Sequence, residues 1–318
     1  MSKQILILYS RDTYPDGQKL YEHHVDKLNA QAAADKVMIE CYYGVLAELV
    51  FWYDGDTYKV VEPRTGRDIA SFDLVFFQKW KFEPQAGLAA AIYLDLNGVR
   101  YISRELRNQN PFDKLSEMSC LIASGLAYAP TLSAAAYTLH SDGTQLLAQY
   151  PLRYPVIIKP VDGTRGEGIR LLENEEALKR YFAELSPSDD TRLLLQTFIS
   201  NDYDYRVTVM GGQVAYVLRR KASEGSIVNN TSAGGEAEFV ESDNWISPEI
   251  ADAVRAAKAV GREDFAGVDV LVGRDGRHVI LEVNKSPEIQ TGFGIDRKMH
   301  QLVKYLGTAA DADKPTGS

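Results

Sequence analysis

The residues best suited to chemistry in this chain lie between Pro155 and Gly168, where the sequence reads PVIIKPVDGTRGEG. An apolar run typical of a strand ends at Lys159, and three glycines follow within residues 163–168. Backbone N–H groups at glycines can surround phosphate oxygens because no Cβ stands in the way, and the lysine adds a positive charge. The pattern predicts a phosphate-binding loop, although its spacing matches neither the P-loop nor the dinucleotide fingerprint. A β-hairpin with a glycine-rich turn is the alternative.

A second set of polar residues interrupts two apolar strands near the C-terminal end of the chain. The strands are predicted at residues 267–273 and 278–284, and the Asp-Gly pair between them is typical of a hairpin turn. Glu282 and Asn284 share one face, and Asp269 lies on the neighbouring strand within cross-strand reach. Buried carboxylates need a partner, and oxygen ligands select Mg²⁺ or Mn²⁺. The pattern predicts a metal site, with a solvent-facing polar stripe on an edge hairpin as the alternative.

The composition excludes several classes of protein. The chain has 318 residues, is 45% hydrophobic and carries a net charge of −9 without a basic run, so we expect no nucleic-acid or membrane-surface partner. Cys41 and Cys120 form no paired framework, the N-terminus reads as a short strand, and no apolar run approaches the roughly 18 residues of a membrane span. These features predict a cytoplasmic protein. They leave open whether it is a homo-oligomer.

The order and spacing of several segments resemble the ATP-grasp superfamily, and in particular the RimK-type and glutathione-synthetase-type carboxylate–amine ligases. The segments that carry the resemblance are Lys114, the glycine loop, LLLQTFIS at 193–200, DYRVTVMGG at 204–212, NTSAGG at 230–235, GVDVL at 267–271 and ILEVNKSP at 280–287. The resemblance covers about residues 100 to 300. It implies an α/β protein whose ATP-grasp fold is built from α+β lobes and preceded by a Rossmann-like pre-ATP-grasp domain.

The resemblance also implies an ATP site. Lys114 and Lys159 would bind the nucleotide, and backbone groups at Phe198 and Ile199 would read the adenine edge. Asp202 or Asp204 would accept hydrogen bonds from the ribose, and the sequence does not choose between them. The remaining nucleotide-binding residues are Asp162, Gly163, Thr164, Gly166, Gly168, Gln196 and Arg206. The alternatives are a solvated helix lysine at 114 and turn aspartates at 202 and 204.

The same resemblance assigns catalytic roles. Arg220 falls on the catalytic arginine of the family, and Asn230 begins a loop that approaches the γ-phosphate and the acceptor. An ion pair with a nearby glutamate is the plain alternative for the arginines. Asp269, Glu282 and Asn284 would hold two Mg²⁺ or Mn²⁺ ions. With Lys159 as a third catalytic residue, these groups imply transfer of the γ-phosphoryl to a carboxylate and attack by an amine on the acylphosphate.

The expected substrates are a small-molecule or peptide carboxylate and an amine. Two positions depart from the family, because Val228 replaces an arginine and Glu288 replaces a glycine. A carboxylate near the acceptor pocket favours a neutral or cationic amine. A small-molecule kinase and a nucleotide-binding protein without turnover are the alternative functions.

The elements that must position these residues divide the chain into four parts. An N-terminal α/β domain is predicted at 1–110, with alternating strands and helices and a hairpin at Asp54-Gly55. A central lobe follows at 111–195, and its first helix carries Leu115, Met118 and Ile122 on one stripe. The C-terminal lobe with the metal site is predicted at 196–307, and a disordered tail at 308–318.

Overall fold

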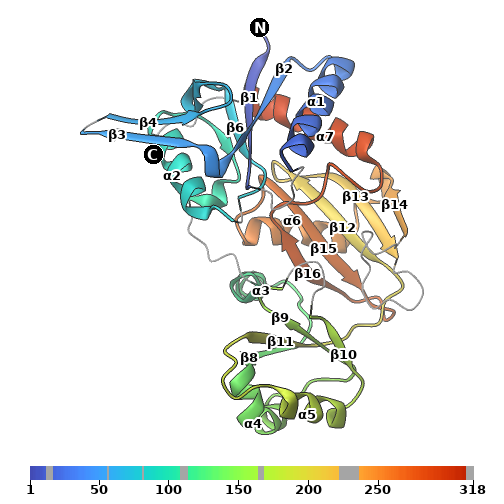
Figure 1. Cartoon of the computed structure of the whole chain (residues 1–318). Helices are drawn as coiled ribbons and strands as arrows, with labels where there is room; N and C mark the ends of the chain where they lie inside the picture. Colours follow the sequence, from blue (N-terminus) through green and yellow to red (C-terminus); the bar gives the residue numbers. More distant parts are fainter. Residues whose placement is uncertain are drawn as a thin grey trace.

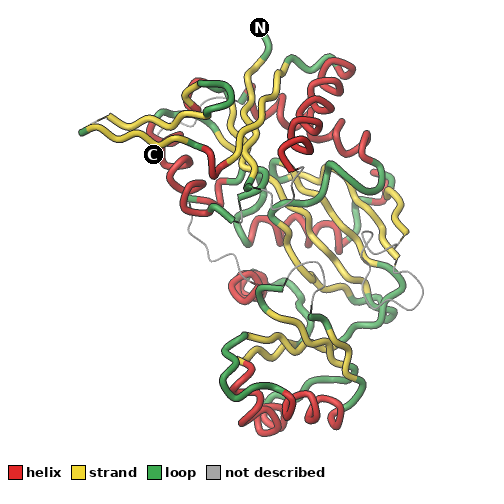
Figure 2. The backbone as a smooth tube through the Cα atoms, in the orientation of Figure 1, coloured by secondary structure: helices red, strands yellow, loops and turns green. Residues whose placement is uncertain are grey.

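The computed structural model describes residues 1–11, 17–55, 57–80, 82–107, 114–163, 168–221 and 236–312. Three layered units follow one another along the chain, each built on a β-sheet (Figure 1). Helices lie on the faces of the sheets, and the tube in Figure 2 shows that most of them are on the outside of the molecule. No helix of the described residues is both long enough and apolar enough to cross a lipid bilayer.

The N-terminal sheet is parallel and has the order β2-β1-β6-β7. Its strands are β1 (Lys3–Tyr9), β2 (Ile39–Val45), β6 (Leu74–Phe77) and β7 (Tyr101–Ile102). Because parallel neighbours need crossovers, helices α1 (Gly17–Asp35) and α2 (Pro84–Leu96) connect them and cover opposite faces. The 3₁₀ turns η1 (Leu46–Glu48), η2 (Ile69–Ser71) and η3 (Arg104–Leu106) complete this unit.

A three-stranded antiparallel sheet is attached to this unit. Strands β3 (Val50–Asp54) and β4 (Thr57–Glu62) form the predicted hairpin, which projects away from the body of the molecule in Figure 1. The positive φ of Gly55, +55°, is of the kind that a tight turn requires. Strand β5 (Arg67–Asp68) pairs with β4.

The central sheet has the order β10-β9-β11-β8. Its strands are β8 (Thr131–Ala135), β9 (Val156–Pro160), β10 (Arg170–Leu172) and β11 (Arg192–Thr197). Helices α4 (Ala136–Gln149) and α5 (Glu175–Glu184) cover one face, against Val156, Ile158, Leu193 and Leu195. Side chains alternate along a strand, so Lys159 and Gln196 lie on the opposite face.

The C-terminal sheet is antiparallel and has the order β14-β13-β12-β15-β16. Its strands are β12 (Asp204–Met210), β13 (Gln213–Lys221), β14 (Glu236–Val240), β15 (Phe265–Val272) and β16 (His278–Asn284). Helices α3 (Lys114–Ala123) and α6 (Pro248–Ala259) contribute to the core on one face, whereas α7 (Ile295–Asp311) and the N-terminal unit pack on the other. The short turn η5 (Ser242–Asn244) precedes α6.

The observed elements do not follow the predicted domain boundaries at every point. Strand β11 runs through the predicted boundary at residue 195, and Leu121 of α3 packs in the core of the C-terminal sheet. The tail predicted from residue 308 is wrong for its first residues, because α7 continues to Asp311 and buries Ala309 and Ala310 in the core shared with α1. Residues 313–318 lie outside the described part of the chain.

Candidate active site

The polar residues predicted for the site lie on the central sheet and on one face of the C-terminal sheet. Lys159 comes from β9, while Arg206, Arg220, Asp269 and Glu282 come from four neighbouring strands of the C-terminal sheet. Their charges act on one another. Burial and the charge of Asp269 raise the pKa of Glu282, while Lys114, Arg206 and Lys159 oppose that rise. The fold therefore brings together residues more than 160 positions apart in the sequence.

Lys114 is bound to the first residues of the glycine loop. Its Nζ donates to the carbonyl oxygens of Val161 at 2.9 Å and Gly163 at 2.7 Å, with that of Pro160 at 3.4 Å. It is therefore not a solvated helix lysine. Asp162 is exposed beside it, and Thr164 and Gly166 lie outside the described residues.

Gly168 ends the loop with a φ of +72°, a conformation that side chains other than glycine rarely adopt. A Cβ at this position would lie 3.0 Å from Cδ of Pro160, at the end of β9. The loop therefore returns close to the strand from which it starts. This glycine requirement agrees with the predicted loop and does not by itself distinguish a phosphate clamp from a hairpin turn.

Lys159 has an uncharged partner. Its Nζ donates to Oε1 of Gln196 at 3.2 Å, and Nε2 of Gln196 donates to Oγ1 of Thr131 at 2.9 Å. Burial lowers the pKa of Lys159, while the charge of Glu282 acts in the opposite direction. Within the described residues no carboxylate forms an ion pair with Lys159, so this cation is available to an anionic ligand.

The segment after β11 uses some of its backbone groups within the protein. The N–H groups of Thr197 and Phe198 donate to the carbonyls of Pro130 and Pro155, each at 2.9 Å. Phe198 can therefore read an adenine edge through its carbonyl oxygen but not through its N–H without losing the bond to Pro155. Ile199 lies beside the turn at Gly273.

The two aspartates predicted for the ribose differ in environment. Asp204 is buried, and its two oxygens accept from Nε and Nη2 of Arg220 at 2.7 and 2.9 Å. Burial raises the pKa of Asp204 to about 6, against the pull of Arg220. Asp202 is exposed and pairs with Arg274 at 2.7 Å. Only Asp202 is therefore open to solvent.

Both site arginines are paired with carboxylates on the same sheet face. Arg206 lies opposite Asp269 in the β12–β15 ladder and donates from Nε and Nη2 to its two oxygens, each at 2.7 Å. Nη2 of Arg220 lies 3.2 Å from Oδ1 of Asp269. Both arginines therefore form ion pairs, as the alternative interpretation expected, but with aspartates instead of a glutamate. The predicted roles of Arg206 at phosphate and Arg220 at the oxyanion would require these pairs to rearrange.

The predicted metal ligands share one sheet face. Asp269 pairs directly with Glu282 in the β15–β16 ladder, and Asn284 lies two residues further on. Burial alone would raise the pKa of Asp269, but the positive charges of Arg206 and Arg220 hold that pKa below its usual value. The pKa of Glu282 is raised by burial and by the negative charge of Asp269. Nδ2 of Asn284 is buried with no partner in the described structure.

This donor set fits a hard divalent ion, because two carboxylates and an amide supply oxygen ligands and the ion would offset the repulsion between Asp269 and Glu282. The described residues contain no group of three or more His, Cys, Asp or Glu side chains that could hold a metal. A bound ion would therefore also rely on Asn284 and on oxygens of the substrate. Asn230 lies outside the described residues.

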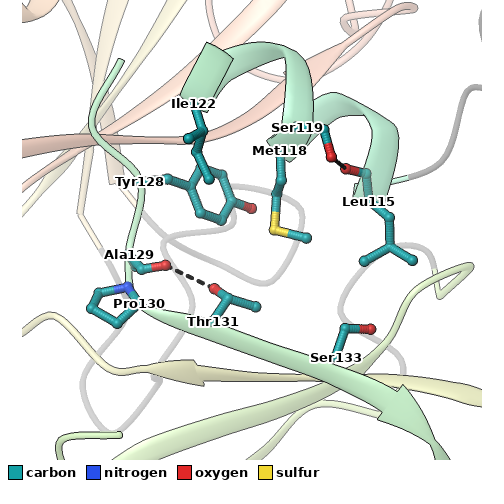
Figure 3. A pocket seen from close by; sticks show the side chains of 9 residues that line it. All are labelled: Leu115, Met118, Ser119, Ile122, Tyr128, Ala129, Pro130, Thr131 and Ser133. Atoms are coloured by element: carbon teal, nitrogen blue, oxygen red, sulfur yellow. Dashed lines mark hydrogen bonds between the residues drawn. The ribbon is translucent and has the colours of Figure 1, made fainter. Parts of the chain in front are cut away.

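A cavity of about 350 Å³ lies beside the site, between α3 and the start of β8 (Figure 3). Its lining consists of Leu115, Met118, Ser119, Ile122, Tyr128, Ala129, Pro130, Thr131 and Ser133. The stripe predicted on this helix therefore lines a cavity, and Ile122 is 62% exposed, whereas Leu121 enters the core. Thr131 connects the cavity wall to Gln196 and so to Lys159.

Two buried groups near the C-terminal sheet were not predicted. Nζ of Lys298, on α7, donates to the carbonyls of Glu288 at 3.3 Å and Thr291 at 2.8 Å. His24 accepts at Nδ1 from Gln290 at 3.0 Å and is bonded there to the hydroxyl of Tyr9. No sequence motif marks either residue, since each acquires its partners from a segment distant in the chain.

The fold is that of the ATP-grasp enzymes. D-alanine–D-alanine ligase from Bacillus anthracis, complexed with ATP, has a TM-score of 0.64 at 13% identity over 97% of both chains. The ATP-grasp ligase PsnB, complexed with its minimal precursor, has a TM-score of 0.62 at 20% identity over 97% of this chain and 99% of its own. Another PsnB complex contains Mg and ADP.

Residues 112–306 match the RimK-like ATP-grasp domain. The probable alpha-L-glutamate ligase of Picosynechococcus sp. is 28% identical over 97% of this chain and 95% of its own length. That of Aeromonas salmonicida is 31% identical over 82% and 83%. The chain belongs to the RimK-like ATP-grasp family, as its motifs predict, and is an ATP-dependent, ADP-forming ligase that makes carbon–nitrogen bonds.

Proposed function

We propose that the enzyme phosphorylates a substrate carboxylate with ATP and that an amine then displaces the phosphate to form an amide. A free carboxylate lacks a good leaving group, and the acylphosphate supplies one. The observation that carries the proposal is that Lys114 and Lys159 donate to neutral oxygens of the protein, while their charges act on the carboxylate of Glu282 on the C-terminal sheet. That arrangement suits a polyphosphate bound between the lobes.

The residues have distinct proposed roles. Lys114 and Lys159 orient the phosphates, together with the loop that includes Asp162, Gly163, Thr164, Gly166 and Gly168. Gln196, Phe198 and Ile199 border the adenine, and Asp202 or Asp204 contacts the ribose. Asp269, Glu282 and Asn284 would hold two Mg²⁺ ions, which neutralise phosphate charge when bound. Arg220 and Asn230 would stabilise the oxyanion that forms during amine attack.

We propose L-glutamate as one of the two substrates, because the relatives are named as glutamate ligases. The charge at Glu288 does not stand alone, since the charges of Glu288 and Arg206 both act on Lys298. The acceptor pocket is therefore less negative than Glu288 by itself suggests, and a substrate carboxylate can be accommodated. The second substrate is a small molecule or a peptide.

The test is an ADP-release assay with L-glutamate against a panel of amino acids, dipeptides and peptides, followed by mass spectrometry. We expect an amide product in the same amount as ADP and free phosphate, with no release by Glu282→Gln. A phosphorylated hydroxyl compound without free phosphate would identify a kinase instead. ATP binding without any product across the panel would favour the non-catalytic alternative.

A further inference from the structure

Both oxygens of Asp269 are in contact with arginine side chains. Arg206 binds them as a two-pronged fork at 2.7 Å, and Arg220 adds a contact at 3.2 Å. The side chain of Asp269 is 9% exposed and that of Arg206 is 25% exposed, so water competes weakly for this pair. A divalent ion at Asp269 would have to approach two guanidinium groups.

The charge balance around Asp269 also opposes a free metal ion. The charges that act on one another here comprise four cations, Lys114, Lys159, Arg206 and Arg220, and four carboxylates, Glu117, Asp204, Asp269 and Glu282. The carboxylates are therefore balanced by cations of the protein itself, which leaves no net negative charge to attract a divalent cation. The phosphates of a nucleotide would add that negative charge.

We propose that Arg206 takes the place of a metal ion at Asp269 until the nucleotide arrives, so that the divalent ion enters only together with the nucleotide phosphates. The proposal rests on the metal site of the proposed function and adds a positioning role for Arg206. When the ion binds Asp269, the guanidinium loses its partner, and the nucleotide phosphates are the anions that can receive it. The alternative is a permanent structural pair that metal binding does not disturb.

The test is a titration with Mn²⁺ of the nucleotide-free enzyme, followed by electron paramagnetic resonance. Arg206→Gln removes the competing charge, so we expect it to bind Mn²⁺ about 10-fold more tightly than the wild type. The matched control is Arg219→Gln, which removes an arginine paired with Glu238 from a neighbouring position of the same sheet. The control should keep wild-type affinity. Equal affinity of the wild type and Arg206→Gln would overturn the proposal.

Two further measurements separate failure of this proposal from failure of the metal assignment. ADP should raise Mn²⁺ affinity strongly in the wild type and less in Arg206→Gln. If no variant binds Mn²⁺ even with ADP, the metal assignment itself fails and the proposal with it. If Arg206→Gln does not fold, Arg206→Lys carries the test, because it keeps the charge but not the fork. We expect intermediate Mn²⁺ affinity for Arg206→Lys, and wild-type affinity would contradict the proposal.

Discussion

The cationic side chains of the central and C-terminal parts of the site differ in their hydrogen-bond partners. On the central side, Lys114 and Lys159 donate to carbonyl and amide oxygens. On the C-terminal side, Arg206 and Arg220 are held by aspartates. A buried ion pair must open before either of its members can bind another group. If these residues bind the nucleotide as proposed, Lys159 can meet a phosphate without leaving a carboxylate of the described residues, whereas Arg206 and Arg220 must first leave their aspartates.

The largest effect is expected where the C-terminal side supplies metal ligands. Glu282→Gln removes a charge and Asn284→Ala removes an oxygen, and each should lower ADP production by about 100-fold or more, because metal stabilisation of phosphoryl transfer amounts to several kcal/mol. Turnover is measured at saturating Mg²⁺, with circular dichroism to verify the fold. Near-normal turnover in both variants would show that these residues do not hold the catalytic metal.

The next effect is expected on the central side. Lys159→Met should weaken ATP binding by about 1.5 to 3 kcal/mol, or roughly 10- to 150-fold, since one charge-assisted phosphate contact is lost. Calorimetry measures the dissociation constant. The matched control is Lys179→Met, an exposed lysine of the same lobe that pairs with Glu175. Equal affinity of the two variants would mean that Lys159 does not contact the nucleotide.

In the N-terminal unit, the buried side chain of His24 is also hydrogen-bonded to uncharged partners, Tyr9 and Gln290. Burial lowers the pKa of His24 from 6.5 to about 3, so the folded state favours the uncharged ring. The stability that this contributes is fully present above pH 6.5 and is lost as the pH falls towards 3, because the unfolded state takes up the proton first. At pH 5 the loss is about 2 kcal/mol.

His24→Gln should lack this loss, so its stability should fall less between pH 7 and 5 than that of the wild type. Urea unfolding at several pH values measures the slope. His23→Gln, a change of the neighbouring exposed histidine, separates the loss of a buried ring from the loss of any histidine. Parallel slopes for wild type and His24→Gln would show that His24 does not become charged on unfolding in this range.

The smallest effect concerns Glu288, where a carboxylate lies near the buried Lys298. Glu288→Gln should shift the ratio of kcat/KM between cationic and anionic amines towards the anionic amine by about 1 kcal/mol, with a smaller shift at high salt. The ratio is measured in a competition assay that offers arginine as the cationic amine and glutamate as the anionic amine. An unchanged ratio at low salt would place Glu288 outside the acceptor pocket.

Local pattern was sufficient for the elements that carry the site. The apolar run before Lys159, the alternation around Glu282 and Asn284, and the Asp-Gly turn between two strands each depend on neighbours in the sequence, and the structure confirms these strands and their turn. The helix that carries Lys114, Leu115 and Met118 was predicted as well. The contacts of this helix were not predicted, because an apolar stripe such as Leu115, Met118 and Ile122 can line a cavity as well as pack in a core.

The sequence by itself determined the family, the strands that carry Lys159, Asp269 and Glu282, and the face that Glu282 and Asn284 share, because these follow from motifs and from the two-residue period of a strand. Only the tertiary structure decided that Arg206 meets Asp269 and that Arg220 meets Asp204, since strand pairing brings together residues 63 and 16 positions apart. Burial is also a tertiary property. It therefore sets the altered pKa values of His24, Lys159 and Glu282, which depend on the desolvation that packing imposes on each side chain.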